Sequence, residues 1–245
     1  IRKTLTQLPG ANIIGEPITM DTAAAIALGT TIVESRQPDG VLCILTADHV
    51  IGDLPLFRAT LKDCLVLASH REVLVTMGIR PRNPNTGFGY IEYGDPCESF
   101  GETEIFAVKR FIEKPDIVRA AQFVAAGNYG WNSGMFAWSV YTLKKALKKH
   151  RPALHDMSRR LLPVVGTKGF SKTLLREYKA LERISIDYAI MEKASNVVVA
   201  KGQFPWSDVG TWAAVEEHLA NDAMQNVLVG DCQVLESVGN VVYSS

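Results

Sequence analysis

The sequence predicts an α/β fold built on a mostly parallel sheet, with helices on both faces. Short apolar runs alternate with amphipathic stretches of helical period, which is the pattern of successive strand-helix units. The chain has 245 residues, enough for one large α/β domain or two small ones. Hydrophobic residues make up 47% and charged residues 21%, close to the globular average, so a disordered or collagen-like chain is excluded.

The first part of the chain is interpreted as two consecutive strand-helix units. Asp21 or Thr22 can cap a helix that runs through Val33, and a second helix starts at Leu54. The expected strands are the apolar runs at 12–15, 41–46 and 73–79.

After Gly78 the pattern changes. GFGYIEYG and IFAVKRFIEKP indicate longer strands separated by an irregular acidic stretch, and SGMFAW at 133–138 follows. An insertion across one edge of the sheet is implied. Further helices are expected at 118–126, 140–149, 173–181 and 186–194, with a strand at 196–200 and a last helix ending near Asn221. The final segment breaks into short strands separated by Gly and Asn, and it resembles the first coil of a β-solenoid.

Charge and apolar patterning exclude several classes of partner. Lys+Arg and Asp+Glu number 26 each, and this balance argues against binding to nucleic acid or to an anionic membrane. No apolar run approaches the roughly 18 residues of a membrane span, and residues 1–10 lack the apolar core of a signal peptide. We therefore expect a cytoplasmic protein. The 4 cysteines form no C-x-x-C and the 5 histidines no H-x-x-x-H pair, so zinc is not expected.

Two aspartates are the leading candidates for a metal site. Asp48 follows the apolar run at 41–46, which we expect to be a central parallel strand, and ligands of open α/β sheets bind at the carboxyl ends of such strands. Asp208 lies between a strand and a helix, and Gly210 allows close approach of the backbone to a ligand. Two carboxylates in one crevice suit Mg²⁺ bound to nucleotide phosphates, because hard cations take oxygen ligands. The alternative for Asp48 is that it simply caps the next short turn, and the alternative for Asp21 is a plain helix cap.

Three further motifs place polar groups near strand ends. FIEKP presents Glu113, which accepts hydrogen bonds from hydroxyls, and Lys114, which neutralises phosphate, before Pro115 opens a helix. An exposed ion pair of little consequence is the alternative. The NPNTGFGY segment around Gly89 could be a ligand loop or a hairpin turn. GWNSGMFAW interrupts a strand at Asn132, where a sugar could bind or a bulge could form.

Several enzyme classes are set aside because their motifs do not occur in these residues. The sequence contains no G-x-x-x-x-G-K-[ST], no G-x-G-x-x-G after a strand, and no G-x-S-x-G. The basic stretch at 144–151 is interpreted as a solvated helix face and helix C-terminus.

Seven segments, taken in order, resemble one enzyme family. The segments are EPITMDTAAAIALG, LTADHVI, NPNTGFGYIEYG, FIEKP, GNYGWNSGMFAW, ISIDYAIMEKA and WSDVGTW. Together they cover nearly the whole chain and are similar to bacterial mannose-1-phosphate guanylyltransferases, also called GDP-mannose pyrophosphorylases, within the sugar-nucleotide pyrophosphorylases. The resemblance implies a Rossmann-like nucleotidyltransferase core with a mostly parallel mixed sheet, followed by a left-handed β-helix. We therefore expect a catalytic domain at 1–222 and the start of a C-terminal β-helix at 223–245.

The resemblance also implies a reaction and a set of site residues. GTP and mannose 1-phosphate would give GDP-mannose and pyrophosphate, with Mg²⁺ as cofactor, and a homodimer is compatible with the family. The implied catalytic residues are Asp48, Lys114 and Asp208, of which Asp48 and Asp208 are the metal ligands. The implied substrate-binding residues are Glu16, Asp21 and Thr22 at the nucleobase and Gly89, Glu113, Asn132 and Asp187 at the sugar.

Two departures from the family pattern bear on these expectations. The family's G-G-x-G-x-R phosphate loop belongs upstream of Ile1, so we expect the natural protein to begin earlier and these 245 residues alone not to catalyse the reaction. Where the family has E-P-x-x-R-N-T-A-P-A, this chain carries Met20 and Asp21 in place of Arg and Asn, which alters the nucleobase contacts. The alternatives are a regulatory nucleotide-sugar-binding paralogue without activity and a pyrophosphorylase for another sugar 1-phosphate.

Overall fold

Contacts within the chain divide it into two units of unequal size. The computed structural model describes residues 3–210 and 222–244. The first unit comprises Ile1–Leu45 and Ala59–Gly202, and the second comprises Thr46–Arg58 and Gln203–Ser245. Helix α2, Leu54–His70, begins in the second unit and continues into the first.

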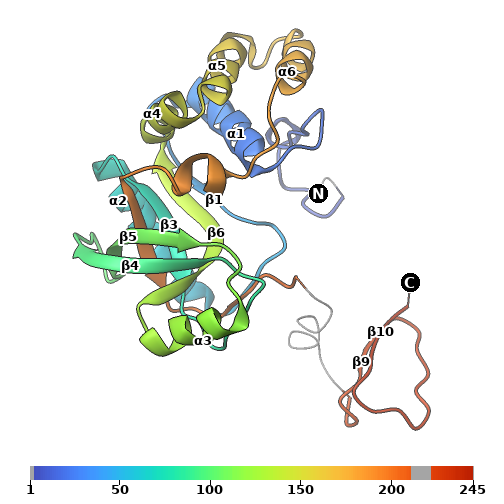
Figure 1. Cartoon of the computed structure of the whole chain (residues 1–245). Coiled ribbons are helices and arrows are strands. Elements are labelled where there is room, and N and C mark those ends of the chain that lie inside the picture. Colours follow the sequence, from blue (N-terminus) through green and yellow to red (C-terminus); the bar gives the residue numbers. More distant parts are fainter. Residues whose placement is uncertain (1–2, 211–221, 245) are drawn as a thin grey trace. The chain divides into compact units, whose positions relative to one another are not determined.

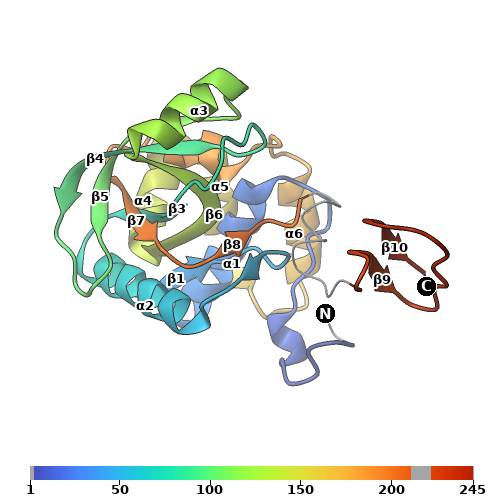
Figure 2. The same ribbon diagram turned by 90° about the horizontal axis from the view of Figure 1, so that it is seen from below.

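A six-stranded mixed sheet forms the centre of the first unit (Figures 1 and 2), with the strand order β1-β6-β3-β7-β5-β4 and an additional pairing of β6 with β4. The strands are β1 Val41–Ile44, β3 Leu74–Ile79, β4 Tyr90–Cys97, β5 Ile105–Ile112, β6 Tyr129–Ser139 and β7 Val197–Gly202. Strands β3 and β7 are parallel, whereas the other pairs of this sheet are antiparallel. The mixed sheet is confirmed, but the expected excess of parallel pairing is wrong.

The position of β1 explains this difference. The long strand β6 runs antiparallel to both β1 and β3 and lies between them. Strands β1, β3 and β7 therefore point the same way, as expected of strand-helix units, without all being neighbours. Among the described strands β1 pairs with β6 alone, so it is an edge strand and not the central one expected. The apolar sequence of β1 predicts that its side chains are buried. It does not predict whether one or two strands pair with it.

Most other strands form where the sequence predicts them. Every residue of β3 is buried, which suits its continuous apolar run. Strands β4 and β5 lie at one end of the sheet, in agreement with an insertion across one edge. The strand expected at 12–15 does not form: Gly10–Asn12 is a short 3-10 turn, η1, and the Arg36 guanidinium donates to Asn12 Oδ1 at 2.8 Å. This segment is held against a helix and has no strand partner among the described residues.

Helices α1, α4, α5 and α6 gather on one side of the sheet, and α3 lies away from them (Figure 1). Their bounds are α1 Thr22–Arg36, α3 Ile117–Ala126, α4 Val140–His150, α5 Pro152–Leu161 and α6 Phe170–Tyr178, with the short turn η2 at Leu162–Val164. An apolar core packs this helical layer onto the sheet, and it includes the fully buried Leu143, Met157 and Trp138. This core fixes the segments that carry the polar cluster described below.

Several helix boundaries differ from expectation. Pro115 does not open α3, because Asp116 is the N-cap and its side chain accepts from the Arg119 N–H at 2.9 Å. Gly127 ends the helix in the left-handed conformation, as predicted. The helix expected at 186–194 is a single π-helical turn, η3 Asp187–Met191, and α5 is a helix that the sequence did not predict.

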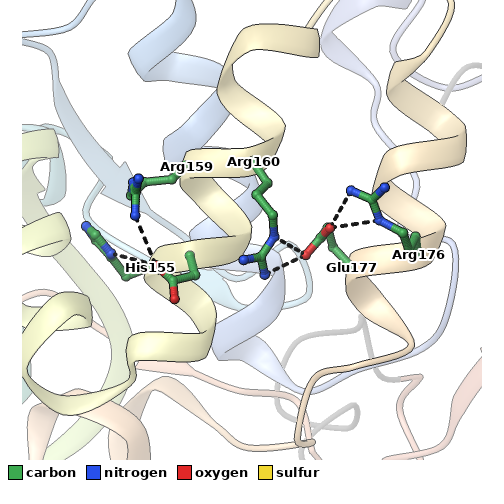
Figure 3. Close-up of polar contacts among 6 residues, drawn as sticks. His155, Arg159, Arg160, Arg176 and Glu177 are labelled. Carbon is green, nitrogen blue, oxygen red and sulfur yellow. Dashed lines mark hydrogen bonds and ion pairs between the residues drawn. The ribbon is translucent and has the colours of Figure 1, made fainter.

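A buried carboxylate joins α5 to α6 (Figure 3). Glu177 is 5% exposed and accepts hydrogen bonds from Arg160 at 2.7 Å and from Arg176 at 2.8 Å. Burial alone would raise the pKa of Glu177, but the two guanidinium groups outweigh it and lower the pKa. The carboxylate therefore stays ionised and ties the two helices together at neutral pH.

The second unit contains short strands. Strand β2, Val50–Ile51, pairs antiparallel with β8, Trp206–Ser207, while β9, Val227–Val229, pairs parallel with β10, Val241–Tyr243. The buried Asn226 side chain donates to Ser237 O at 2.9 Å and accepts from Asn240 N at 2.9 Å, which closes the loop between β9 and β10. The helix expected to end near Asn221 lies outside the described residues.

No helix within the described ranges has the length and apolar character needed to cross a lipid bilayer.

Candidate functional site

The first part of the site is a polar cluster in the first unit, and a bulge in β6 supplies one of its members. Thr76 of β3 pairs with Phe136, but Gly78 pairs with Asn132, so two extra residues are accommodated in β6. Gly134 adopts a φ of 66° within this irregularity, a conformation that favours glycine. The Asn132 side chain accepts from Gly134 N at 3.2 Å and donates to Asp187 Oδ1 at 2.8 Å. The bulge, one of the two alternatives for this segment, is confirmed, and sugar binding by Asn132 stays a prediction.

Asp187 opens the π-helical turn η3 and is partly buried. Burial raises the pKa of Asp187 above its ordinary value, the hydrogen bond from Asn132 opposes this, and the nearby charge of Asp21 adds to it. Such single π-turns are frequent at functional sites. The arrangement gives an oriented carboxylate that accepts hydrogen bonds.

Gly89 and Glu113 complete the predicted sugar-binding set. The Asn132 N–H donates to Gly89 O at 2.8 Å, and a Cβ on Gly89 would lie 2.8 Å from Glu113 Oε2. Glycine is therefore required for this close approach. The segment before Gly89 is not a hairpin turn, because β4 pairs with β5 and β6 and not with β3. The structure thus brings Gly89, Glu113, Asn132 and Asp187 together.

Lys114 lies beside this cluster. Its ammonium is 3.7 Å from Glu113 Oε1, both side chains are substantially exposed, and the ion pair therefore contributes little to stability. The Lys114 backbone has a φ of 39°, an uncommon value for a residue other than glycine. Strained backbone of this kind is often found at ligand-binding positions.

Two further residues of the ISIDYAIMEKA segment, which were assigned no role from the sequence, join the cluster. Burial raises the pKa of Glu192, and the charges of Asp187 and Glu113 raise it further. The charge of Glu113 is also the first cause of the raised pKa of Tyr188. Glu192 follows Asp187 by one π-turn, and its N–H donates to Asp187 O at 3.0 Å. In an α-helix, a residue five positions after Asp187 would lie on a different face from it. The π-turn brings Glu192 to the same face as Asp187, and the sequence gives no sign of that turn.

The residues predicted for the nucleobase are held at the start of α1. Asp21 caps the helix by accepting from Thr22 N at 2.8 Å, and Thr22 Oγ1 accepts from Ile186 N at 2.9 Å. Glu16 accepts from the Tyr178 hydroxyl at 3.1 Å. The Asp21–Thr22 turn therefore lies against the segment that leads into η3. A contact from these residues to a base stays a prediction.

The two aspartates of the predicted metal site both belong to the second unit. Val50 pairs with Ser207, so Asp48 and Asp208 lie at the same end of the β2–β8 ribbon. Asp208 Oδ1 accepts from Gly210 N at 3.1 Å, and a Cβ on Gly210 would lie 2.8 Å from Asp208 Oδ2. Gly210 therefore permits this tight turn.

His49 supports the ribbon between the two aspartates. Its Nδ1 accepts from the Trp206 indole N–H at 3.0 Å, and the two rings meet edge to face at 5.1 Å. Burial lowers the pKa of His49, although Asp48 and Asp208 each act to raise it. Both carboxylates are thus close to the same ring, which is neutral at pH 7. The sequence carries no signal for this role of His49, because its hydrogen-bond partner Trp206 is distant in the chain.

The donor chemistry of this ribbon fits Mg²⁺. Within residues 3–210 and 222–244, no group of three or more His, Cys, Asp or Glu is arranged to hold a metal ion by itself. Mg²⁺ is usually bound through one or two carboxylates together with waters and substrate phosphates. Asp48 and Asp208 fit an ion that arrives with a nucleotide.

Comparisons with known proteins identify the family of this chain. The family model described as nucleotidyl transferase matches residues 4–225. Mannose-1-phosphate guanylyltransferase of Escherichia coli K12 is 36% identical over 236 residues, which is 95% of this chain and 49% of the relative. The enzyme of the same description from Sinorhizobium fredii is 34% identical over 96% of this chain and 45% of its own length. The chain spans about half the length of the curated relatives it matches.

A solved structure shares the fold over nearly all of this chain. The crystal structure of a Thermus thermophilus protein, described as a mannose-1-phosphate geranyltransferase, is 36% identical. It superposes with a TM-score of 0.79 and covers 94% of this chain and 65% of that protein. The fold of this chain is therefore one already seen in an experimental structure.

Proposed function

This chain belongs to the nucleotidyl transferase family, and from that membership we propose that it transfers the guanylyl group of GTP to mannose 1-phosphate, giving GDP-mannose and pyrophosphate. The observation that carries the proposal is the preformed polar cluster of the first unit, in which Asn132 donates to Asp187 at 2.8 Å beside Gly89 and Glu113. The similarity of this chain to mannose-1-phosphate guanylyltransferases over most of its length supports the choice of substrates.

The reaction needs positioning and charge neutralisation more than activation of a nucleophile. An oxygen of mannose 1-phosphate forms a bond to the α-phosphorus of GTP. The bond from this phosphorus to the oxygen that bridges to the β-phosphorus breaks, and pyrophosphate leaves with the electron pair. Since the attacking phosphate oxygen is already anionic, no protein base has to remove a proton. Catalysis then rests on alignment and on neutralising the accumulated negative charge.

The polar cluster would hold the sugar. Asp187 and Glu113 accept hydrogen bonds from the sugar hydroxyls, and Asn132 keeps Asp187 in one orientation through the bond at 2.8 Å. Lys114, exposed and next to Glu113, neutralises the sugar phosphate. Gly89 leaves room for the Glu113 carboxylate because it has no Cβ.

Asp48 and Asp208 would hold Mg²⁺ at the end of the β2–β8 ribbon. Bound with GTP, the ion would withdraw negative charge from the phosphates during transfer. The ribbon supplies the two carboxylates, and the Trp206 indole N–H holds the nearby ring of His49. Glu16 and the Asp21–Thr22 turn would face the nucleobase, where a carboxylate accepts from the N1 and N2 donors of guanine.

Two finer features of the family are also proposed. The parallel pairing of β9 with β10 across residues 230–240 supports the start of a β-helix, because solenoid coils stack their strands in parallel. A homodimer is the assembly compatible with the family.

The proposal is tested by pyrophosphate release from the full-length protein across a panel of sugar 1-phosphates and nucleoside triphosphates. We expect GTP with mannose 1-phosphate to give the highest kcat/KM. A higher kcat/KM with another sugar 1-phosphate or another nucleoside triphosphate would identify those compounds as the substrates instead. Binding of GDP-mannose without any turnover would identify a regulatory nucleotide-sugar-binding protein instead.

A further inference from the structure

A basic cavity of about 740 Å³ lies in the first unit, apart from the polar cluster. Its lining comes from the segment after β3, from β4, β6 and β7, and from the end of α3. The lining residues are Arg80, Pro81, Arg82, Tyr93, Val124, Gly127, Tyr129 and Lys201. None of them belongs to the polar cluster of Gly89, Glu113, Asn132 and Asp187, and none is acidic.

Arg80 and Arg82 are the distinctive members of this lining. They flank Pro81, and both line the same cavity. Within the described part of the chain, neither guanidinium has a hydrogen bond or an ion pair to another residue. The basic side chains of α5 and α6 differ in this respect, since Arg160 and Arg176 are both bound to Glu177. Two guanidinium groups with open hydrogen-bonding forks thus face one cavity.

Lys201 adds a third cation, and its partial neutralisation leaves the cavity positive. The Lys201 ammonium is 2.7 Å from Glu104 Oε2 and lies over the Phe106 ring at 5.9 Å. The carbonyl end of α3 at Gly127 contributes roughly half a negative charge. Two arginines and Lys201 carry three positive charges, and Glu104 and the helix end offset about one and a half of them. The cavity keeps a net positive charge of about one to two units.

The rest of the wall is rigid. The Tyr93 hydroxyl donates to Gly78 O at 3.3 Å, and Tyr93 stacks on Phe106 with ring centroids 5.4 Å apart. A Cβ on Gly130 would lie 2.1 Å from the Tyr93 hydroxyl oxygen. The position of the Tyr93 ring therefore requires glycine at position 130. Tyr129 stacks on Phe123 at 4.3 Å. The cavity is therefore shaped by packed aromatic rings before any ligand enters.

We propose that this cavity is a binding site for a phosphorylated small molecule, gripped by Arg80 and Arg82 together with Lys201 of the neighbouring strand β7. Its volume of about 740 Å³ falls within the range of small-molecule pockets. Paired guanidinium groups recognise phosphate through parallel N–H donors, and a lining without carboxylates does not compete for them. A nucleotide, a sugar phosphate and inorganic pyrophosphate all offer the group that this chemistry selects.

The test is arginine-specific modification of the full-length protein with phenylglyoxal, mapped by mass spectrometry. The probes are inorganic pyrophosphate, GDP and mannose 1-phosphate, each compared with KCl at the same ionic strength. We expect at least one probe to slow the modification of Arg80 and Arg82 about ten-fold at about ten times its Kd, while Arg159 stays equally reactive. The probe that protects most strongly identifies the source of the phosphate. No protection by any of the three, beyond the KCl effect, overturns the proposal.

Variants separate this cavity from the polar cluster. R80S/R82S removes both guanidinium groups and should lose one binding event in calorimetry, whereas R159S/K168S, which removes two exposed cations elsewhere, should keep it. Asn132→Ala alters the polar cluster and should leave the protection of Arg80 and Arg82 unchanged. If Asn132→Ala abolishes the protection, the probe acts from the polar cluster and the cavity is not a site. If R80S/R82S binds every probe as the unaltered protein does, the proposal is also wrong.

Discussion

The polar cluster of the first unit and the aspartate ribbon of the second are assembled in opposite ways. Asn132 and Asp187 are far apart in the chain and are joined directly by a hydrogen bond of 2.8 Å within a packed fold. Asp48 and Asp208 are brought together by two short strands, and the hydrogen bond of Asp208 is local, to Gly210. The first region is oriented by the protein itself, whereas the second offers charge that a cation can organise.

This difference indicates how each region contributes to the proposed reaction. Preformed hydrogen bonds lower the cost of ordering a neutral sugar, so their loss should weaken binding of the sugar phosphate. A pair of carboxylates at a ribbon end contributes through the ion it holds, so its loss should reduce the rate of transfer. Altering the ribbon should therefore lower kcat, and altering the cluster should raise KM.

The largest effect is expected from Asp208→Asn. The substitution keeps the shape of the side chain and its acceptor for Gly210 N but removes one negative charge from the ribbon. We expect kcat to fall by about 10³-fold, with little change in KM for mannose 1-phosphate. Pyrophosphate release measured across a Mg²⁺ titration checks this, and raised Mg²⁺ should restore part of the rate.

Asp53→Asn is the matched control for this variant. Asp53 belongs to the same unit and accepts from Leu56 N at 3.0 Å at the start of α2. Asparagine caps helices about as well as aspartate, so stability and rate should both be preserved. A normal kcat in Asp208→Asn would remove Asp208 from the metal site.

The second effect is expected from Lys114→Ala. Its exposed ammonium is paired weakly with Glu113, so the fold should tolerate the loss. An uncompensated sugar phosphate should raise KM for mannose 1-phosphate by about 10–100-fold. Steady-state kinetics measure it, with Lys172→Ala, an exposed lysine on α6, as the control. If mannose 1-phosphate saturates the Lys114→Ala variant at the same concentration as the unaltered protein, Lys114 does not contact the phosphate.

Local patterns in the sequence predict much of the fold. The apolar run of β3, the glycine stop at Gly127 and the cap at Asp21 are encoded by neighbouring residues, and all three are confirmed. The edge position of β1 is different, because it is decided by β6, a strand almost a hundred residues further along. Strand pairing between distant segments leaves no mark in either segment alone.

The candidate site shows the same division between local and distant information. The family motifs mark Asn132 and Asp187, yet nothing local states that they bond to one another. Glu192 joins them because η3 is a π-turn, which the ordinary helical period does not predict. His49, next to Asp48 in the sequence, is held by a hydrogen bond from Trp206, a residue 157 positions further along the chain. The motifs therefore indicate some of the candidate residues, and the tertiary fold decides their contacts and adds further neighbours.

A smaller effect is expected from Gly89→Ala. The added Cβ would lie 2.8 Å from Glu113 Oε2, the far end of a flexible side chain, so the carboxylate should move while the fold persists. We expect KM for mannose 1-phosphate to rise about ten-fold with kcat nearly unchanged. Gly169→Ala is the control, because its Cβ would make only an ordinary contact of 3.6 Å with Thr167 Oγ1. Equal kinetics in the two variants would contradict the close packing of Glu113 on Gly89.

The smallest effect, and the sharpest test of a preformed cluster, is the stability of Asp187→Asn. Burial raises the pKa of Asp187 in the folded state, so ionising this group opposes folding at any pH above its unfolded value. Asparagine keeps an acceptor for Asn132 without the charge, and Tm at pH 7.5 should rise by about 2 °C even as activity falls. As the pH is lowered toward about 4, which is close to the unfolded pKa, the folded aspartate takes up its proton and the unfolded one is about half protonated, so most of the difference in Tm should disappear. Calorimetric scans of both proteins across this range measure it, with the exposed Asp156→Asn as a control that gains nothing at pH 7.5. A loss of stability at pH 7.5 that persists at pH 4 would mean that the carboxylate supports the fold, and the cluster would then be a structural network and not a binding site held ready for sugar.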